Sequence, residues 1–229
     1  MDRQILWDCH MHSSFSADSD TPMEVMIHRA VETGLQGITF TEHLDPDYPV
    51  TPDNLDFSLD IPAYKEKLAE LSDMYKDKIQ VRFGIELGLQ MHLGEYFESI
   101  LENISAYDGF DVYGHIDYIV RYGPNKNREY SYGRYKDILD EILKKLISMG
   151  KGIELNTGGY HYGLGEPNPC TAVIRRYREL GGEIITIGAD AHTPDKIACA
   201  FDKAASVLEA CGFRYYTIFK DRKPEFISL

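Results

Sequence analysis

The chain has 229 residues, of which 43% are hydrophobic and 27% are charged, a balance typical of a soluble globular protein that can bury a core without disulfides. Its 24 basic and 37 acidic residues leave a formal net charge of −13, which argues against nucleic acid or an anionic membrane surface as a partner. The four cysteines are scattered, and no stretch resembles a signal peptide or a membrane span, so we expect one cytoplasmic domain over residues 1–229.

Short apolar runs that end in polar side chains recur along the chain. The first covers residues 5–7 and leads into Asp8-Cys9-His10-Met11-His12, where the two histidines share one side of an extended backbone. Four later runs, at 37–41, 79–85, 110–113 and 184–189, lead into Glu42-His43, Glu86, His115, and Asp190 with His192. Five predicted strands therefore end in side chains that can bind metals.

Helical patterns separate these strands. Thr21-Pro22-Met23-Glu24 predicts a capping box with proline at the first helical position, and apolar spacing continues to Gly34. Further helices are predicted over residues 61–78, 95–105, 135–149, 168–180 and 202–210, with a long loop at 44–59 and a hairpin at 214–229. Alternation of strand and helix predicts parallel strands with helical crossovers. In a closed barrel of this type, the functional site lies at the C-terminal ends of the strands.

The ligand types restrict the chemistry. Imidazoles mixed with carboxylates suit zinc, manganese, iron or nickel and do not distinguish among them. Several such ligands around more than one ion indicate a multinuclear centre, which lowers the pKa of bound water and neutralises charge in a phosphoryl displacement. The sequence carries no P-loop, dinucleotide fingerprint or serine-hydrolase elbow that would indicate another chemistry.

Taken together, the motifs resemble the polymerase-and-histidinol-phosphatase (PHP) family, and most of all its histidinol-phosphatase branch. The resemblance runs over nearly the whole chain. It is carried by Asp8-x-His10-x-His12, Thr41-Glu42-His43, Gly84-Ile85-Glu86, Gly114-His115-Ile116-Asp117 and Gly188-Ala189-Asp190-Ala191-His192. It implies an α/β fold, a distorted (β/α) barrel of the PHP type with six or seven strands, and a metal centre that hydrolyses phosphate esters.

The resemblance also implies a ligand set and a reaction. It places His10, His12, Glu86 and Asp190 on a first metal, Glu86 and His115 on a second, and Asp18, His43 and His192 on a third. Two or three divalent ions per chain (zinc, manganese or iron) would be the cofactors. The expected reaction is hydrolysis of histidinol phosphate, with Asp190 or His192 moving a proton and Arg121 gripping phosphate. Asp8 is expected to orient a histidine ligand. The sequence indicates no oligomeric state.

Three departures from the family pattern leave alternatives open. A strand ending in a Ser-Val-His-like motif, expected between Glu86 and His115, has no counterpart, and one ligand of the second metal is lost with it. His92 and His161 are the spare histidines that could replace it. His161 and Asn168 stand where relatives carry a basic residue and a histidine. The alternatives are therefore hydrolysis of another small phosphomonoester or phosphodiester, or a degenerate metal-binding protein without activity.

Overall fold

Strands and helices alternate along this computed structural model, which describes residues 5–45, 56–88, 96–123 and 125–229, and the predicted α/β class is confirmed. The chain divides into two units, each assembled from segments that are distant in the sequence. The N-terminal unit contains residues 5–90 and 188–199, and the C-terminal unit contains residues 91–187 and 200–229 together with 1–4. Among the described residues, the first unit has one sheet and the second has two.

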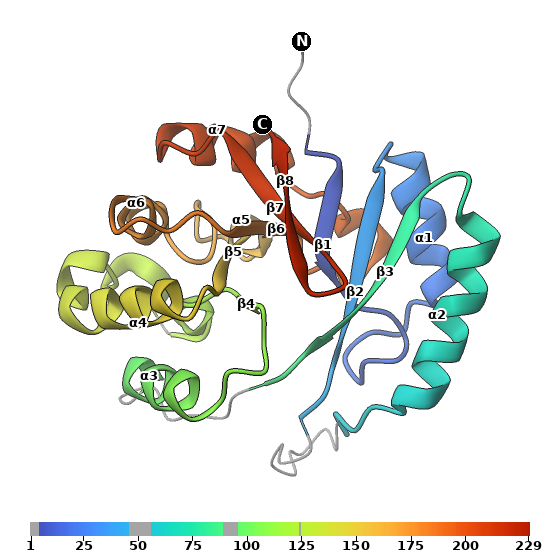
Figure 1. The fold of residues 1–229 in the computed structure, drawn as a ribbon, viewed down its shortest axis with the longest axis horizontal. Coiled ribbons are helices and arrows are strands. Elements are labelled where there is room, and N and C mark those ends of the chain that lie inside the picture. The colour runs from blue at the N-terminus through green and yellow to red at the C-terminus, as the bar shows by residue number, and fades with distance from the viewer. Residues whose placement is uncertain (1–4, 46–55, 89–95, 124) are drawn as a thin grey trace. The chain divides into compact units, whose positions relative to one another are not determined.

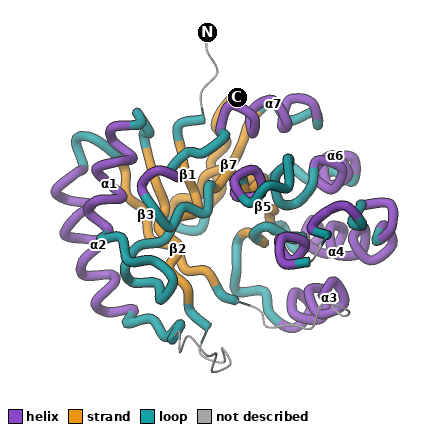
Figure 2. Tube along the Cα trace, turned by 180° about the vertical axis from the view of Figure 1, so that it is seen from behind, coloured by secondary structure: helices purple, strands orange, loops and turns teal. Residues whose placement is uncertain are grey.

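The N-terminal unit is a parallel three-stranded sheet in the order β1-β2-β3. Two helices, α1 and α2, lie together beside this sheet in both views (Figures 1 and 2). Ile38, Phe40 and Glu42 alternate as buried residues along the second strand, the spacing that points one side of a strand into the interior. The elements are β1 (Trp7–Met11), α1 (Met23–Glu32), β2 (Gly37–His43), α2 (Ile61–Tyr75), β3 (Gln80–Glu86) and a 3-10 turn (Pro194–Lys196).

The C-terminal unit combines a three-stranded sheet, in the order β4-β5-β6, with an antiparallel β7-β8 hairpin. Every residue of β5 is buried, as is typical of a strand covered on both faces. The elements are α3 (Tyr96–Ala106), β4 (Val112–Tyr113), α4 (Lys136–Ser148), β5 (Gly152–Asn156), α5 (Gly158–His161), α6 (Thr171–Glu179), β6 (Ile185–Gly188), α7 (Phe201–Ala210), β7 (Tyr215–Lys220) and β8 (Lys223–Ser228), with 3-10 turns at 118–122, 126–128 and 132–134. Among the described residues, no helix is long and apolar enough to cross a bilayer.

The strands of the described residues form sheets of three, three and two strands, and no closed barrel is found among them. The six- or seven-stranded barrel expected from the family resemblance therefore stays a prediction at this point. The expected single domain over residues 1–229 stays a prediction too. His92 lies outside the described residues, as does most of the loop expected at 44–59.

The capping box expected at the first helix is wrong. Pro22 occupies the cap position, and no side chain caps the helix there. Instead, the Thr21 hydroxyl donates to the carbonyl oxygen of His192 at 3.2 Å, and the Ser19 hydroxyl donates to the same oxygen at 2.9 Å. Two hydroxyls that precede the helix thus hold a residue that is distant in the sequence, an arrangement that local capping rules do not predict.

In the C-terminal unit, α4 and α6 are joined by an ion pair that we expect to stabilise the fold. Arg176 donates from Nε to Asp140 Oδ1 at 2.9 Å and from Nη2 to Oδ2 at 2.7 Å, and the Tyr132 hydroxyl donates to Oδ1. Asp140→Asn should lower the free energy of unfolding by about 1.5–3 kcal/mol, the range for hydrogen bonds to charged groups. Urea denaturation at pH 7 measures this loss.

The difference between wild type and Asp140→Asn should depend on pH. The hydrogen bonds from Arg176 lower the pKa of Asp140 to about 2. A lowered pKa stabilises the folded state above the unfolded value of about 4 and loses that contribution as the pH falls toward 2. The two proteins should therefore converge in stability at acidic pH. Lys67→Ala, which breaks an exposed pair with Glu70 on α2, should change stability by less than about 1 kcal/mol and serves as the control.

Candidate metal centre

Side chains that can bind metals meet at the carboxyl ends of β1, β2 and β3. His10 lies in β1 and His12 directly follows it, while His43 and Glu86 are the last residues of β2 and β3. Parallel pairing sets His43 opposite Glu86. The chain returns to this place near Asp190, whose N–H donates to the His10 carbonyl at 2.9 Å. Backbone pairing thus gathers residues from four separate segments of the N-terminal unit.

The first cluster consists of His10, His12, Glu86 and Asp190. Nε2 of His10 lies 2.8 Å from Glu86 Oε2 and 3.6 Å from Asp190 Oδ1. Nε2 of His12 lies 3.2 Å and 3.4 Å from the same two oxygens. Tetrahedral ligands at roughly 2.1 Å from an ion stand about 3.4 Å apart, and these four distances of 2.8–3.6 Å are close to that spacing. The donor set therefore fits a divalent metal.

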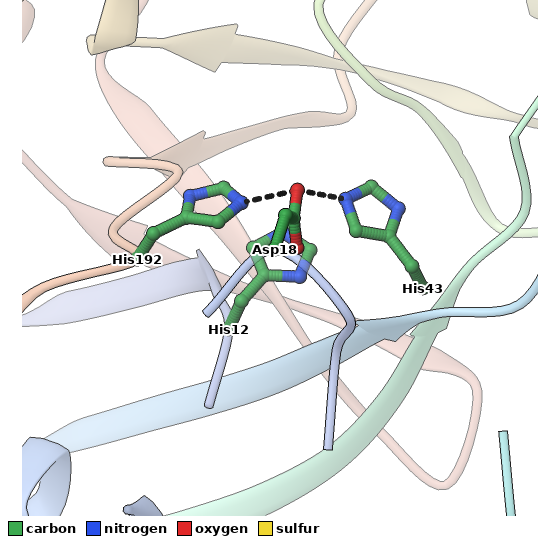
Figure 3. Close-up of side chains that lie close together, drawn as sticks. All are labelled: His12, Asp18, His43 and His192. Atoms are coloured by element: carbon green, nitrogen blue, oxygen red, sulfur yellow. Dashed lines mark hydrogen bonds and ion pairs between the residues drawn. The ribbon is translucent and has the colours of Figure 1, made fainter. Parts of the chain in front are cut away.

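The second cluster consists of His12, Asp18, His43 and His192. Figure 3 shows the two outer imidazoles on either side of one Asp18 carboxylate oxygen. His192 Nε2 lies 3.2 Å and His43 Nε2 lies 3.5 Å from Asp18 Oδ2. The His12 ring stacks against both other rings, with centroids 4.4 Å from His43 and 4.3 Å from His192. Because His12 belongs to both clusters, the two candidate sites share one imidazole.

The electrostatic field of the carboxylates in these clusters favours positively charged groups beside them. Burial opposes ionisation of Asp190, but the charge of His10 and the hydrogen bond to His12 hold its pKa well below the usual value. Burial likewise disfavours the charged form of His43, yet its hydrogen bond to Asp18 and the charge of Glu86 raise the pKa of its imidazole to about 9. A field that favours imidazolium at this place would also favour a divalent cation.

Asp190 occupies an unusual backbone position. Its φ of 55° lies in the left-handed region, which aspartate adopts more readily than most residues. The turn directs a carboxylate that is only 6% exposed toward the two histidines of β1. A non-glycine residue in this conformation stores local strain of about 1–3 kcal/mol that the surrounding structure must offset, and such positions cluster at functional sites.

Asp8 orients the backbone around the first cluster, and the contacts found for it do not include a ligand ring. Its fully buried carboxylate accepts N–H groups from Ala189 at 2.9 Å, from Ala198 at 3.0 Å and, at 3.4 Å, from His10. Burial raises the pKa of Asp8 to about 6 against these bonds. The expectation that Asp8 orients an imidazole is therefore wrong in its detail. The carboxylate instead joins the start of β1 to the segment that carries Asp190.

His115 and Arg121 belong to the C-terminal unit. The N–H of His115 donates to Glu154 Oε2 at 3.1 Å, and its φ of 22° is again positive. Glu154, in the middle of the buried strand β5, is an acidic neighbour of His115 that the strand-end pattern did not single out. The Arg121 guanidinium lies over the rings of Tyr118, Tyr122 and Tyr162, 4.2–5.3 Å from their centroids. Its role as a phosphate clamp stays a prediction.

The two positions that depart from the family pattern also lie in the C-terminal unit. His161, at the end of α5, packs against Tyr162 with ring centroids 4.2 Å apart. Asn168 is buried, and its side-chain amide donates to Asp117 at 2.7 Å. Asp117 also accepts the N–H of Cys170 at 2.8 Å. Asn168 therefore ties the segment before α6 to a buried carboxylate of its own unit.

A model of the PHP domain family matches residues 8–108 and 91–158 of the chain. A histidinol-phosphatase of Lactococcus lactis is 27% identical over 260 residues, which cover 94% of this chain and 95% of the relative. A probable histidinol-phosphatase of Clostridium acetobutylicum is 29% identical over 251 residues, covering 92% of this chain and 95% of the relative. Both alignments are longer than this chain, so parts of each relative have no counterpart here.

One solved structure extends this likeness to three dimensions. The crystal structure of histidinol phosphate phosphatase from Lactococcus lactis, complexed with zinc, L-histidinol and phosphate, matches with a TM-score of 0.86. The two proteins are 27% identical, and the match covers 96% of this chain and 98% of the other. The similarity thus extends over nearly the full length of both proteins.

Proposed function

The chain belongs to the PHP domain family, and from this premise we propose that it is a metal-dependent phosphatase that hydrolyses histidinol phosphate to histidinol and inorganic phosphate. The observation that carries the proposal is the first cluster, in which two imidazoles and two carboxylates approach to 2.8–3.6 Å. The relatives named histidinol-phosphatase and the structural neighbour with zinc, L-histidinol and phosphate support the choice of substrate. The same likeness supports the PHP-type barrel expected for the chain.

We propose zinc as the metal, with manganese or iron as the other ions that this donor set suits. The first ion would be held by His10, His12, Glu86 and Asp190, and another by Asp18, His43 and His192. His115, with Glu86, is the proposed contributor to a further ion. When bound, such ions lower the pKa of water and offset the charge that develops on a transferring phosphoryl group.

The chain's own side chains would position the substrate and move protons. Asp190 and His192 are the proposed proton-transfer residues, and the imidazole Nδ1 of His192 lies 3.0 Å from the Asp190 carbonyl oxygen. The hydroxyls of Ser19 and Thr21 hold the backbone of His192 by donating to its carbonyl oxygen. Arg121 is the proposed phosphate clamp, because a guanidinium pairs with phosphate through two parallel hydrogen bonds. The tyrosines around it would restrict its orientation.

Release of inorganic phosphate from histidinol phosphate by the zinc-loaded chain tests the proposal. We expect turnover that disappears on treatment with a chelator and returns when zinc is restored. A panel of p-nitrophenyl phosphate, other small phosphomonoesters and a phosphodiester measures selectivity. Turnover of a panel compound with none for histidinol phosphate would overturn the substrate assignment. A chain that binds zinc and hydrolyses no ester would be a metal-binding protein without activity.

A further inference from the structure

Glu42 is a fully buried carboxylate that the ligand pattern does not use. It directly precedes His43 in β2, and strand alternation turns it inward beside Ile38 and Phe40. Its oxygens accept three hydrogen bonds, from the Ser13 N–H at 3.1 Å, the Ser13 hydroxyl at 2.6 Å and the Ser16 hydroxyl at 2.6 Å. Because a buried carboxylate is unfavourable without hydrogen-bond donors, these three bonds are what allows Glu42 to lie in the interior.

The Ser16 hydroxyl connects this carboxylate to a histidine of the metal centre. Its oxygen lies 2.6 Å from Glu42 Oε2 and 3.1 Å from His12 Nδ1, and it accepts the N–H of His43 at 3.0 Å. A serine hydroxyl has one proton, and a carboxylate can only accept. That proton therefore goes to Glu42, so the third partner, His12 Nδ1, must itself carry a proton and donate to Ser16.

We propose that Glu42, acting through Ser16, is a positioning residue that holds His12 in the tautomer protonated at Nδ1. Nε2 then presents its lone pair to the first cluster, where it lies 3.2 Å from Glu86 Oε2 and 3.4 Å from Asp190 Oδ1. The inference rests on the proposed function only in treating this cluster as a metal site. A hydrogen bond to the second nitrogen of a histidine ligand sets its tautomer and ring orientation.

The Ser16 hydroxyl also links two strands' ends through its hydrogen bonds. The same hydroxyl oxygen accepts the His43 N–H at the end of β2, so Ser16 ties the loop after β1 to β2 and to His12 at once. His12 is the residue shared by both clusters. A change at Ser16 should therefore disturb metal binding more than a change at Ser13, which bonds the same carboxylate but has no bond to His12 among those found here.

The test uses the full chain with two matched variants, Ser16→Ala and Ser13→Ala, each of which removes one hydroxyl from Glu42. In the metal-free wild type at alkaline pH, nitrogen-15 NMR of histidine-labelled protein should show His12 protonated at Nδ1, with the signal assigned by His12→Gln. Ser16→Ala should shift this tautomer signature and weaken zinc binding by roughly 10–100-fold, measured by competition with a fluorescent chelator. Ser13→Ala should keep the Nδ1–H signature of His12, and its zinc affinity should stay within about threefold of wild type, a smaller change than the loss expected for Ser16→Ala.

A third variant, at Glu42 itself, separates a positioning role of this carboxylate from a merely structural one. Glu42→Met keeps the length of the side chain but cannot accept the Ser16 hydroxyl proton, so that proton can turn toward His12 Nδ1 and the Nε2–H tautomer of His12 should become populated. A wild-type His12 protonated at Nε2 would overturn the inference, as would equal loss of zinc affinity in the two serine variants. The tautomer is read without metal or substrate. A wild type that shows the Nδ1–H form but binds no zinc would therefore count against the proposed function and leave the assignment of Glu42 standing.

Discussion

Asp190→Asn is expected to lower the rate of histidinol phosphate hydrolysis by more than about 10²-fold, beyond the loss typical of residues that only support metal ligands. The carboxylate lies within 3.4–3.6 Å of both histidines of the first cluster, and the charge of His10 and the hydrogen bond to His12 hold its pKa low. Replacing it by a neutral amide removes one of the two negative charges that face these imidazoles. Zinc content per chain, measured by mass spectrometry of the dialysed protein, should fall in parallel with activity.

The matched control is Asp195→Asn, five residues away in the same unit. Asp195 is an exposed residue that pairs with Lys196 and accepts from the Thr193 hydroxyl. We expect this variant to keep wild-type activity and zinc content, because its charge lies outside both clusters. An Asp190→Asn protein that keeps full zinc content and full turnover would contradict the placement of Asp190 in the metal centre.

Gly37→Ala is expected to destabilise the protein by about 3 kcal/mol. Gly37 pairs directly with Trp7 across β1 and β2, and a methyl group there would overlap the six-membered ring of the buried indole. The ring cannot move away freely, because the Arg82 guanidinium lies over it, 4.1 Å from the ring centroid. Trp7 is the single tryptophan of the sequence, so urea unfolding followed by its fluorescence reports on this contact directly.

Gly133→Ala provides the comparison for this experiment. A methyl group at Gly133 would meet no atom within 4 Å, and its backbone lies outside the left-handed region. The free energy of unfolding of the Gly133→Ala protein should remain within about 0.5 kcal/mol of the wild-type value, as for most surface substitutions. Since Trp7 directly precedes the segment that carries His10, Gly37→Ala should also weaken zinc binding. Equal urea midpoints for the two glycine variants would show that the indole does not fill the space at Gly37.

The sequence predicted the type and order of most elements because their signals are local. Apolar spacing over 135–149 indicated α4, and alternation in the tail indicated the β7-β8 hairpin. Boundaries moved by a few residues: β2 continues through His43, and α2 ends at Tyr75. The strand-end pattern also predicted which residues of the N-terminal unit would come together, since carboxyl ends of parallel strands meet at one place. Their roles as ligands stay a prediction.

Only the tertiary structure decided which groups distant in the sequence form hydrogen bonds with each other. Thr21 fits a capping box by its neighbours, yet its hydroxyl bonds His192. Asp8 was expected to contact an imidazole and instead accepts N–H groups of Ala189 and Ala198. The strand-end pattern included Glu42 but did not indicate its hydrogen bonds to Ser13 and Ser16, because these partners lie in the loop after β1. Periodicity determines which face of an element is buried, whereas the choice of partner for a buried polar group depends on which segments the fold brings within about 3 Å.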